Sequence, residues 1–333
     1  MTPYRAKSTP VKVGEALVDI KQIVVEYSQQ FENGNPGETI IYLSLLPIED
    51  ALKAISTMIV DTTHYGILLD SYYSQSMNAE VLKELFGTKY EYILQETAEY
   101  TRKTHPFEAI KLFEKLRCYE EIFEIIIENQ TQFILKYLMN IKTNYVGLNR
   151  NQHENPKKLK EEFTNMTAYY KKKGIFKGFD REYQAIQDMF AVIQFYENYN
   201  MGAYDKALSE LNTKKILPVS ATDVLDDYLK KYSKFHFEVK KLYPLLIFST
   251  MQILSIEARQ RNESRQKTFN IQSYLKKMTY EDIKFVAKNL SILLPEVMDS
   301  KKEACKELLP YLNELGIKDI EAEVKKYSNE IMQ

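Results

Sequence analysis

The stretch from Asp188 to Ile256 constrains the fold most, because long apolar runs alternate in it with short polar breaks. It reads DMFAVIQFYENYNMGAYDKALSELNTKKILPVSATDVLDDYLKKYSKFHFEVKKLYPLLIFSTMQILSI. The apolar residues recur at steps of three and four, which predicts helices. We expect a helix ending near Gly202, a partner helix ending before Pro218, a capped third helix, and an apolar helix opened by Pro244. This pattern is typical of the packed interior of a helical stack and shows no catalytic apparatus.

The rest of the chain predicts an all-α fold. Only 10 glycines and 10 prolines occur among 333 residues, whereas sheets and hairpins need glycine-rich turns. Helical spacing predicts these further helices: Glu15–Phe31, Thr39–Leu46, Glu49–Val60, Gly66–Tyr73, Val81–Phe86, Tyr90–Tyr100, Phe107–Leu116, Tyr119–Gln130, Lys157–Lys173, Phe179–Asn200 and Tyr204–Leu211. Average helix and loop lengths give roughly 15 helices and no strand. Short turns between amphipathic helices predict an irregular solenoid of antiparallel helix pairs, each burying its apolar face against its neighbours.

Local signals indicate where helices start and end. Three pairs have the spacing of a capping box, in which two polar side chains cap the start of a helix: Ser220 with Asp223, Thr279 with Asp282, and Ser300 with Glu303. Pro295, Pro310 and Gly316 are expected to end the C-terminal helices. We expect one α-helical solenoid domain over residues 1–333, with a loose end at 1–10 and a candidate flexible boundary in the polar run 149–156.

Composition excludes several classes of protein. The 45 basic and 46 acidic residues are interspersed and give a formal net charge of −1, whereas nucleic-acid binding needs a basic excess on one face. The two cysteines, Cys118 and Cys305, have no metal-like spacing, which is typical of a reducing compartment. The most apolar run, Leu242–Ile256, is shorter and more polar than a membrane span of about 20 residues. We therefore expect a soluble protein that neither crosses a membrane nor binds nucleic acid directly.

Three aspartates form a candidate metal site. Asp223, Asp226 and Asp227 stand at helical spacing, and clustered aspartates can hold magnesium at a diphosphate site. A second aspartate-rich helix to face them is missing. Carboxylates in the first turn of a helix are also favoured by the helix dipole without any metal. We therefore expect no metal site and no catalytic residue.

Other polar candidates are scattered. Asp61 and His64 are placed to share a helix face, for which a surface or capping role is the simpler interpretation. Cys118 lies at a helical turn beside Arg117, a cation that would modestly lower the pKa of the thiol, although small cysteines are common in such turns. No glycine-rich phosphate loop is present, so no cofactor is expected. The four histidines stand singly, without the spacing of metal ligands: His64, His105, His153 and His236.

Basic clusters and an aromatic run are candidates for binding. The clusters could touch acidic partners or lipid head groups, but the acidic residues mixed among most of them favour solvated helix faces. They comprise Lys157, Lys158 and Lys160; Lys171, Lys172 and Lys173; and Arg259, Arg261, Arg265 and Lys267. The aromatic residues have helical spacing and apolar neighbours, which favours core packing over base stacking. They are Phe190, Phe195, Tyr196 and Tyr199.

The order and spacing of several segments resemble those of a known family. The segments are FYENY (195–199), GAYDKAL (202–208), LPVS (217–220), FHFEVK (235–240), LL (245–246) and TMQIL (250–254). Together they resemble the C-terminal part of the nucleoporin interacting component family, the inner-ring scaffold nucleoporins of the nuclear pore complex. The hairpin Thr104–Ile127 is similar to an earlier hairpin of that family. The good match covers about 70 residues, and its specificity lies in the order of the whole set.

The resemblance implies a structural scaffold and not an enzyme. It implies a folded-back, coat-like solenoid at the nuclear pore complex that supports pore assembly and nucleocytoplasmic transport through protein–protein contacts. Implied partners are inner-ring scaffold and linker nucleoporins, with no cofactor and no small-molecule substrate, and the partner-contact residues stay unknown. Family members carry an N-terminal coiled-coil region, and no sustained heptad pattern precedes Glu15. We therefore expect this chain to be a C-terminal piece of a longer chain or a shortened relative.

Two alternatives stay open at this point. A helical-repeat adaptor or lid subunit of another large assembly, such as a vesicle coat or the proteasome lid, would have the same kind of fold. An all-α enzyme would instead hold a metal with its aspartates, and Asp223→Ala and Asp227→Ala would then abolish metal binding and activity.

Overall fold

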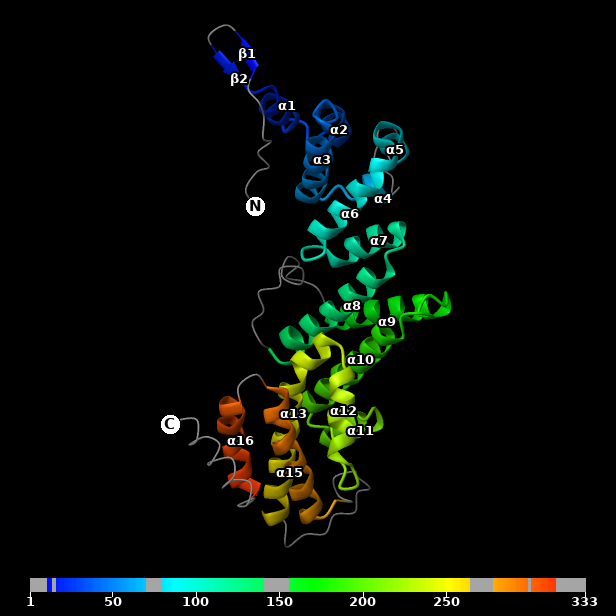
Figure 1. Ribbon diagram of the computed structural model, residues 1–333. Helices are drawn as coiled ribbons and strands as arrows, with labels where there is room; N and C mark the ends of the chain where they lie inside the picture. Colours follow the sequence, from blue (N-terminus) through cyan, green and yellow to red (C-terminus); the bar gives the residue numbers. More distant parts are fainter. Residues whose placement is uncertain are drawn as a thin grey trace. The chain divides into compact units, whose positions relative to one another are not determined.

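The structure, a computed structural model, describes residues 11–13, 16–69, 79–140, 156–263, 278–298 and 301–315. The described chain is almost entirely helical (Figure 1), so the prediction of an all-α fold is confirmed. Contacts divide the chain into two compact units, the first comprising Met1–Ile125 with Asn144–Glu154 and the second Ile126–Thr143 with Asn155–Gln333. The expected loose end and nearly all of the expected flexible boundary lie outside the described residues. A single domain over the whole chain stays a prediction.

A short hairpin precedes the first helix. Strands β1 (Val11–Val13) and β2 (Ala16–Val18) pair antiparallel, with Val11 opposite Val18. The expected helix from Glu15 was therefore placed too early, since valine favours extended chain. Helix α1 (Ile20–Ser28) starts after Asp19, whose carboxylate accepts a hydrogen bond from the Gln22 amide at 3.0 Å. The side-chain cap fixes the start of the helix where periodicity alone did not.

The first unit is built of consecutive helices that pack on near neighbours in the chain. α1 packs on α2, α2 on α3, α3 on α6 and α6 on α7, while α4 contacts α5 and α7. This is the arrangement expected of a solenoid, in which each helix pair buries its apolar face only against its neighbours. The helices are α2 (Pro36–Leu43), α3 (Ile48–Thr62), α4 (Gly66–Leu69), α5 (Ala79–Phe86), α6 (Tyr90–Thr101) and α7 (Pro106–Leu116).

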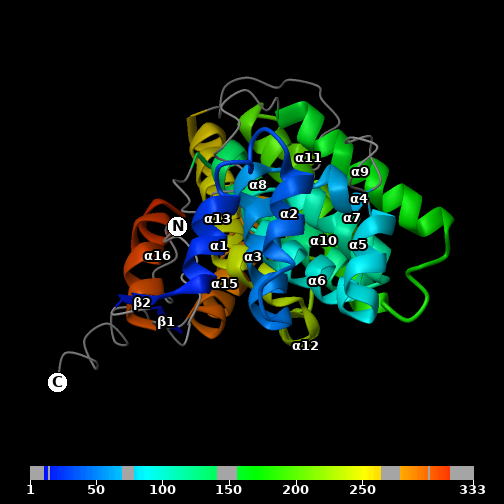
Figure 2. The same cartoon turned by 90° about the horizontal axis from the view of Figure 1, so that it is seen from above.

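The second unit has a helical hairpin and a layer of three long helices. α10 and α11 form the hairpin, and α13, α15 and α16 pack on one another, as Figures 1 and 2 both show. α8 (Tyr119–Phe133) contains the point at which the two units divide and continues into a π-helical turn, Ile134–Leu138. The other helices are α9 (Pro156–Lys172), α10 (Asp180–Asn200), α11 (Tyr204–Thr213), α12 (Leu225–Lys234), α13 (Phe237–Glu263), α15 (Tyr280–Val297) and α16 (Lys301–Leu315).

Helices α10 and α13 form the core of the second unit. Both carry buried residues on several faces, which is the pattern of an interior helix. In α10 they are Ala185, Ile186, Asp188, Met189, Ala191, Val192, Ile193, Phe195, Tyr196 and Asn198. In α13 they include Val239, Leu242, Tyr243, Leu246, Ile247, Met251, Ile253 and Leu254. The prediction of a packed interior between Asp188 and Ile256 is confirmed for α10 and α13. It is wrong for α12 in the same stretch, where Tyr228 is the only buried residue.

Prolines at helix starts behave as the sequence predicts, but three prolines inside helices do not. Pro106 opens α7 and Pro156 opens α9, where the missing amide is not needed. Pro244, Pro295 and Pro310 were expected to bound helices, yet they lie inside α13, α15 and α16. Around Pro244 the flanking residues Leu242, Tyr243, Leu246 and Ile247 are all fully buried. Their packing as one surface outweighs the local cost of the proline.

Of the expected capping boxes, one is confirmed and one is wrong. Thr279 caps α15: its hydroxyl accepts from the Asp282 amide at 3.1 Å, and its own amide donates to the Asp282 carboxylate at 2.6 Å. Asp223 instead accepts from the Ser220 amide at 2.8 Å and closes a turn. The helix that follows, α12, starts only at Leu225 without a side-chain cap. Ser300 lies outside the described residues.

We predict that Tyr243→Phe destabilises the protein by about 1–3 kcal/mol, because it leaves a buried carbonyl without a donor. The Tyr243 hydroxyl, fully buried in α13, donates to the Ile216 carbonyl at 2.7 Å. Urea denaturation followed by circular dichroism measures the change. Tyr204→Phe is the matched control, since Tyr204 is only half-buried. Equal effects of the two changes would contradict the assignment.

Candidate functional site

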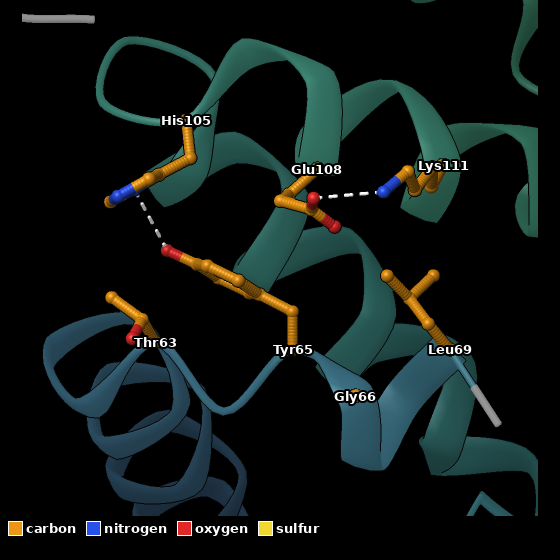
Figure 3. Close-up of a pocket in the computed structure, with 7 residues that line it drawn as sticks. All are labelled: Thr63, Tyr65, Gly66, Leu69, His105, Glu108 and Lys111. Carbon is orange, nitrogen blue, oxygen red and sulfur yellow. Dashed lines mark hydrogen bonds and ion pairs between the residues drawn. The ribbon is translucent and has the colours of Figure 1, made fainter. Parts of the chain in front are cut away.

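An open pocket lies in the first unit between the end of α3, the start of α4 and the first turns of α7. Its volume is about 530 Å³. Figure 3 shows side chains from all three elements lining it. They are Thr63, Tyr65, Gly66, Leu69, His105, Glu108 and Lys111.

Backbone geometry positions the polar groups of this pocket. Thr63 ends α3 in the left-handed conformation, with φ of 60°, which turns the chain into the segment that carries Tyr65. The nearly buried Tyr65 hydroxyl lies 3.1 Å from His105 Nδ1. His105 is the residue before Pro106, and proline restricts it to the non-helical conformation required there. The hydroxyl and the imidazole therefore form a fixed pair at one side of the pocket.

The other side of the pocket is charged and aliphatic. Lys111 Nζ and a Glu108 carboxylate oxygen lie 2.8 Å apart on one face of α7. Leu69 faces them across the pocket (Figure 3). The pocket thus combines hydrogen-bonding groups, one acidic and one basic side chain, and an aliphatic contact, but none of its lining residues is a cysteine. Such an arrangement suits binding of a short peptide segment better than covalent catalysis.

The aspartates proposed for a metal site are not arranged for one. Asp223 lies in the turn before α12, and Asp226 and Asp227 lie in the first turn of that helix, where the dipole favours carboxylates. Within the part of the chain that the structure describes, no group of three or more His, Cys, Asp or Glu side chains is placed to hold a metal ion.

The histidines play separate local roles. His105 lines the pocket, and His236 Nδ1 accepts a hydrogen bond from the Glu238 amide at 3.2 Å at the start of α13. Asp61 and His64 do not share a helix face, because α3 ends at Thr62 and the next residue is left-handed. His153 lies outside the described residues.

Cys118 is not an activated thiol. Burial, with the nearby carboxylates Glu121 and Glu99, raises its pKa, whereas the neighbouring Arg117 was expected to lower it. Arg117 itself adopts the left-handed conformation that ends α7, with φ of 58°. The side chain of Cys305, in α16, is outside the described set.

The aromatic and basic candidates behave largely as solvated or core residues. Phe195 and Tyr196 are fully buried with ring centroids 5.0 Å apart, so the core interpretation is confirmed for them. Lys160 pairs with Glu197 at 2.5 Å, and Lys158 lies 4.0 Å from Glu162. Lys171, Lys172 and Lys173 are exposed at the end of α9, as is Arg259 on α13, while the side chains of Arg261, Arg265 and Lys267 are not described.

A buried carboxylate escaped prediction. Asp188, only 1% exposed in the middle of α10, accepts from Gln184 Nε2 at 2.9 Å. Lys231 of α12 donates to the carbonyls of Lys214 and Lys215 at 2.6 and 3.1 Å, at the end of α11. Burial raises the pKa of Asp188 and lowers the pKa of Lys231. A single aspartate beside an apolar run, DMFAVI, was the signal of this carboxylate in the sequence.

Comparison with protein families decides where the chain belongs. Residues 3–294 match the sequence profile of the family described as Nup93/Nic96. The chain belongs to the Nup93/Nic96 family. Members of this family are non-enzymatic structural nucleoporins of the nuclear pore complex, so the chain is a nucleoporin located there. The expectation of a non-enzyme is thereby confirmed, and the metal-enzyme and coat or proteasome-lid alternatives are set aside.

A solved structure supports the same fold. The chain is similar to the crystal structure of Chaetomium thermophilum Nic96 SOL, with a TM-score of 0.52 and 14% sequence identity. The similarity covers 93% of this chain and 46% of that chain, so this Nup93/Nic96 member spans less than half of the solved relative. The prediction of an α-helical solenoid is confirmed. No curated protein sequence matches the chain significantly. None of the described helices is long and apolar enough to cross a bilayer.

We predict that Asp188→Asn stabilises this nucleoporin at pH 7. Because the pKa of Asp188 is raised in the fold, the folded state binds more protons than the unfolded state, and stability falls as pH rises above the usual value of about 3.9. The Asp188→Asn variant should not show this fall in stability with rising pH. The gain should shrink as the pH is lowered below about 4, where the wild-type carboxyl is protonated. Thermal unfolding across this pH range measures it.

Asp180→Asn is the control on the same helix. Asp180 is exposed in the first turn of α10, where the dipole favours its charge, so its loss should give no gain at pH 7. A pH-independent effect of Asp188→Asn, or an equal gain from both changes, would contradict the assignment.

Proposed function

We propose that this nucleoporin is a structural scaffold of the inner ring of the nuclear pore complex. The observation that carries the proposal is the family match over residues 3–294, together with the solenoid fold. Family membership assigns the chain to the nuclear pore complex. The inner ring is the narrower location that we propose. Its function is to support pore assembly and nucleocytoplasmic transport through protein–protein contacts.

The physical basis of scaffolding is the way the helices are stabilised. Each helix of the first unit packs on near neighbours, and α10 and α13 are buried through the second. A stack of this kind holds its surface residues at fixed spacing, because moving one helix would expose apolar area on the next. Grooves between helices then accept partner helices or short linear segments.

We propose the pocket between α4 and α7 as one partner contact, and inner-ring scaffold or linker nucleoporins as the partners. Tyr65 and His105 offer a hydroxyl and an imidazole at one side. Glu108 and Lys111 offer both signs of charge at the other. An extended polar segment of a partner could pair its backbone and charged groups with this set.

Affinity capture of the tagged chain from cell extract at moderate salt tests the inner-ring assignment. We expect inner-ring nucleoporins in near-equal amounts, and a ring of fluorescence at the nuclear envelope from the tagged protein. Quantitative mass spectrometry and imaging provide the readouts. Co-purification with coat subunits, proteasome subunits or only peripheral pore proteins would contradict the assignment.

A charge swap tests the pocket. The double change Glu108→Lys with Lys111→Glu keeps the ion pair and the helix but reverses the charges offered to a partner. We expect a small fall in melting temperature, because a cation replaces Glu108 in the first turn of α7, where the dipole favours an acid. We also expect a several-fold lower yield of one co-purifying nucleoporin, since a misplaced interface charge costs roughly 1–3 kcal/mol. The matched control is the swap Lys158→Glu with Glu162→Lys on α9, a comparable exposed pair. Equal losses from both swaps would exclude the pocket.

A further inference from the structure

The turn between α9 and α10 carries a concentration of positive charge. We define the basic turn as residues 169–183, with the sequence YYKKKGIFKGFDREY. It contains five cationic and two acidic residues, a net charge of +3 in a chain whose formal net charge is −1. The cations are Lys171, Lys172, Lys173, Lys177 and Arg181, and all five are exposed.

Helix stability does not account for all of these cations. The dipole favours basic residues at the end of α9, which explains Lys171 and Lys172. Lys177 lies beyond that helix, and Arg181 lies in the first turn of α10, where the dipole disfavours a cation. The ion pairs Lys158–Glu162 and Lys160–Glu197 involve residues nearer the start of α9. All five cations of the basic turn are exposed, so their charge faces solvent.

The basic turn is anchored to the fold by Phe176. Gly174 and Gly178 adopt positive φ values of 69° and 97°, which allows a tight reversal of the chain. Phe176 is only 8% exposed, and its ring centroid lies 4.6 Å from that of Tyr183. In Figures 1 and 2 the turn lies at the outer end of α9, on the side of the second unit away from α13, α15 and α16. A projecting tip can meet a flat surface.

The aromatic residues of the basic turn favour a lipid surface over nucleic acid. Single-stranded nucleic acid binds in a groove and stacks its bases on free aromatic faces. Here lysine ammonium groups already lie over the rings: Lys173 Nζ is 4.2 Å from the Tyr169 ring centre, and Lys171 Nζ is 5.6 Å from that of Tyr183. Tyr169 is 43% exposed and amphipathic, as is typical of the interface between head groups and water.

We propose that the basic turn is a peripheral membrane contact that binds the anionic head groups of a lipid bilayer. Attraction between a cationic segment and an anionic leaflet falls off within a Debye length, so the contact needs the projecting position of the turn. It is independent of the nucleoporin partners, since it requires only this chain and lipid.

Flotation of the purified full-length chain with lipid vesicles tests the proposal. Vesicles of phosphatidylcholine with about 30% phosphatidylserine should bind the chain at about 0.1 M salt, and vesicles of phosphatidylcholine alone should not. Binding should be lost at about 0.5 M salt, because screening removes the attraction. Equal flotation with both kinds of vesicle, or none with either, would overturn the proposal.

Variants assign the binding to the turn. The triple change Lys171→Gln, Lys172→Gln and Lys177→Gln should lower partitioning more than tenfold, at about fivefold for each charge lost. The charge-matched control changes three exposed lysines of the first unit: Lys53→Gln, Lys89→Gln and Lys103→Gln. This control should keep partitioning to the vesicles within twofold of the unchanged chain. Lys177→Gln alone, at an exposed turn position, should lower partitioning to the anionic vesicles about fivefold. This single variant tests the site if the triple variant fails to fold.

Two results would overturn the assignment. One is an equal loss in the turn variant and its control, which would indicate non-specific charge attraction. The other is binding of single-stranded RNA, lost in the turn variant, without any binding to anionic vesicles.

Discussion

The burial of apolar helix faces against neighbouring helices is the interaction on which this structure depends. α10 and α13 illustrate it, because both are buried on several faces and neither would be a stable helix in water on its own. Their side chains place α11 beside α10, and α15 and α16 beside α13. In the first unit the same rule joins α1 to α2, α3 to α6, and α6 to α7.

Polar groups fix the positions of the helices within this apolar packing. The Tyr243 hydroxyl reaches the Ile216 carbonyl, and Lys231 reaches two carbonyls at the end of α11. A buried donor or acceptor that loses its partner is costly, so the buried Tyr243 contact favours one alignment. Asp188 is the exception, since its burial raises its pKa and makes the charged form unfavourable.

The family and the geometry together assign function to the surface. A nucleoporin of the Nup93/Nic96 family acts through contacts, and the described surface offers two chemically different ones. The pocket between α4 and α7 combines a tyrosine–histidine pair with an ion pair and suits a peptide. The basic turn after α9 is convex and cationic and suits an anionic surface. Both features include residues at helix ends.

The all-α class, the apolar helices α10 and α13, and several helix starts could be predicted from the sequence alone. Pro106 and Pro156 at first positions, and the capping box of Thr279 with Asp282, are local signals whose physics involves only a few neighbouring residues. The order of segments from FYENY to TMQIL also pointed to the correct family. The pocket could not be predicted from the sequence, because its lining residues come from three separate elements.

Features that depend on residues distant in the chain could be seen only in the folded structure. Pro244, Pro295 and Pro310 stay inside helices. At Pro244, buried side chains on both sides pack as one surface and offset the local cost of proline. The pKa of Cys118 is raised by burial and by carboxylates, not lowered by the adjacent Arg117. Capping and periodicity act over one helical turn and can be read from sequence, whereas burial depends on which helices become neighbours, and that is settled only when the chain folds.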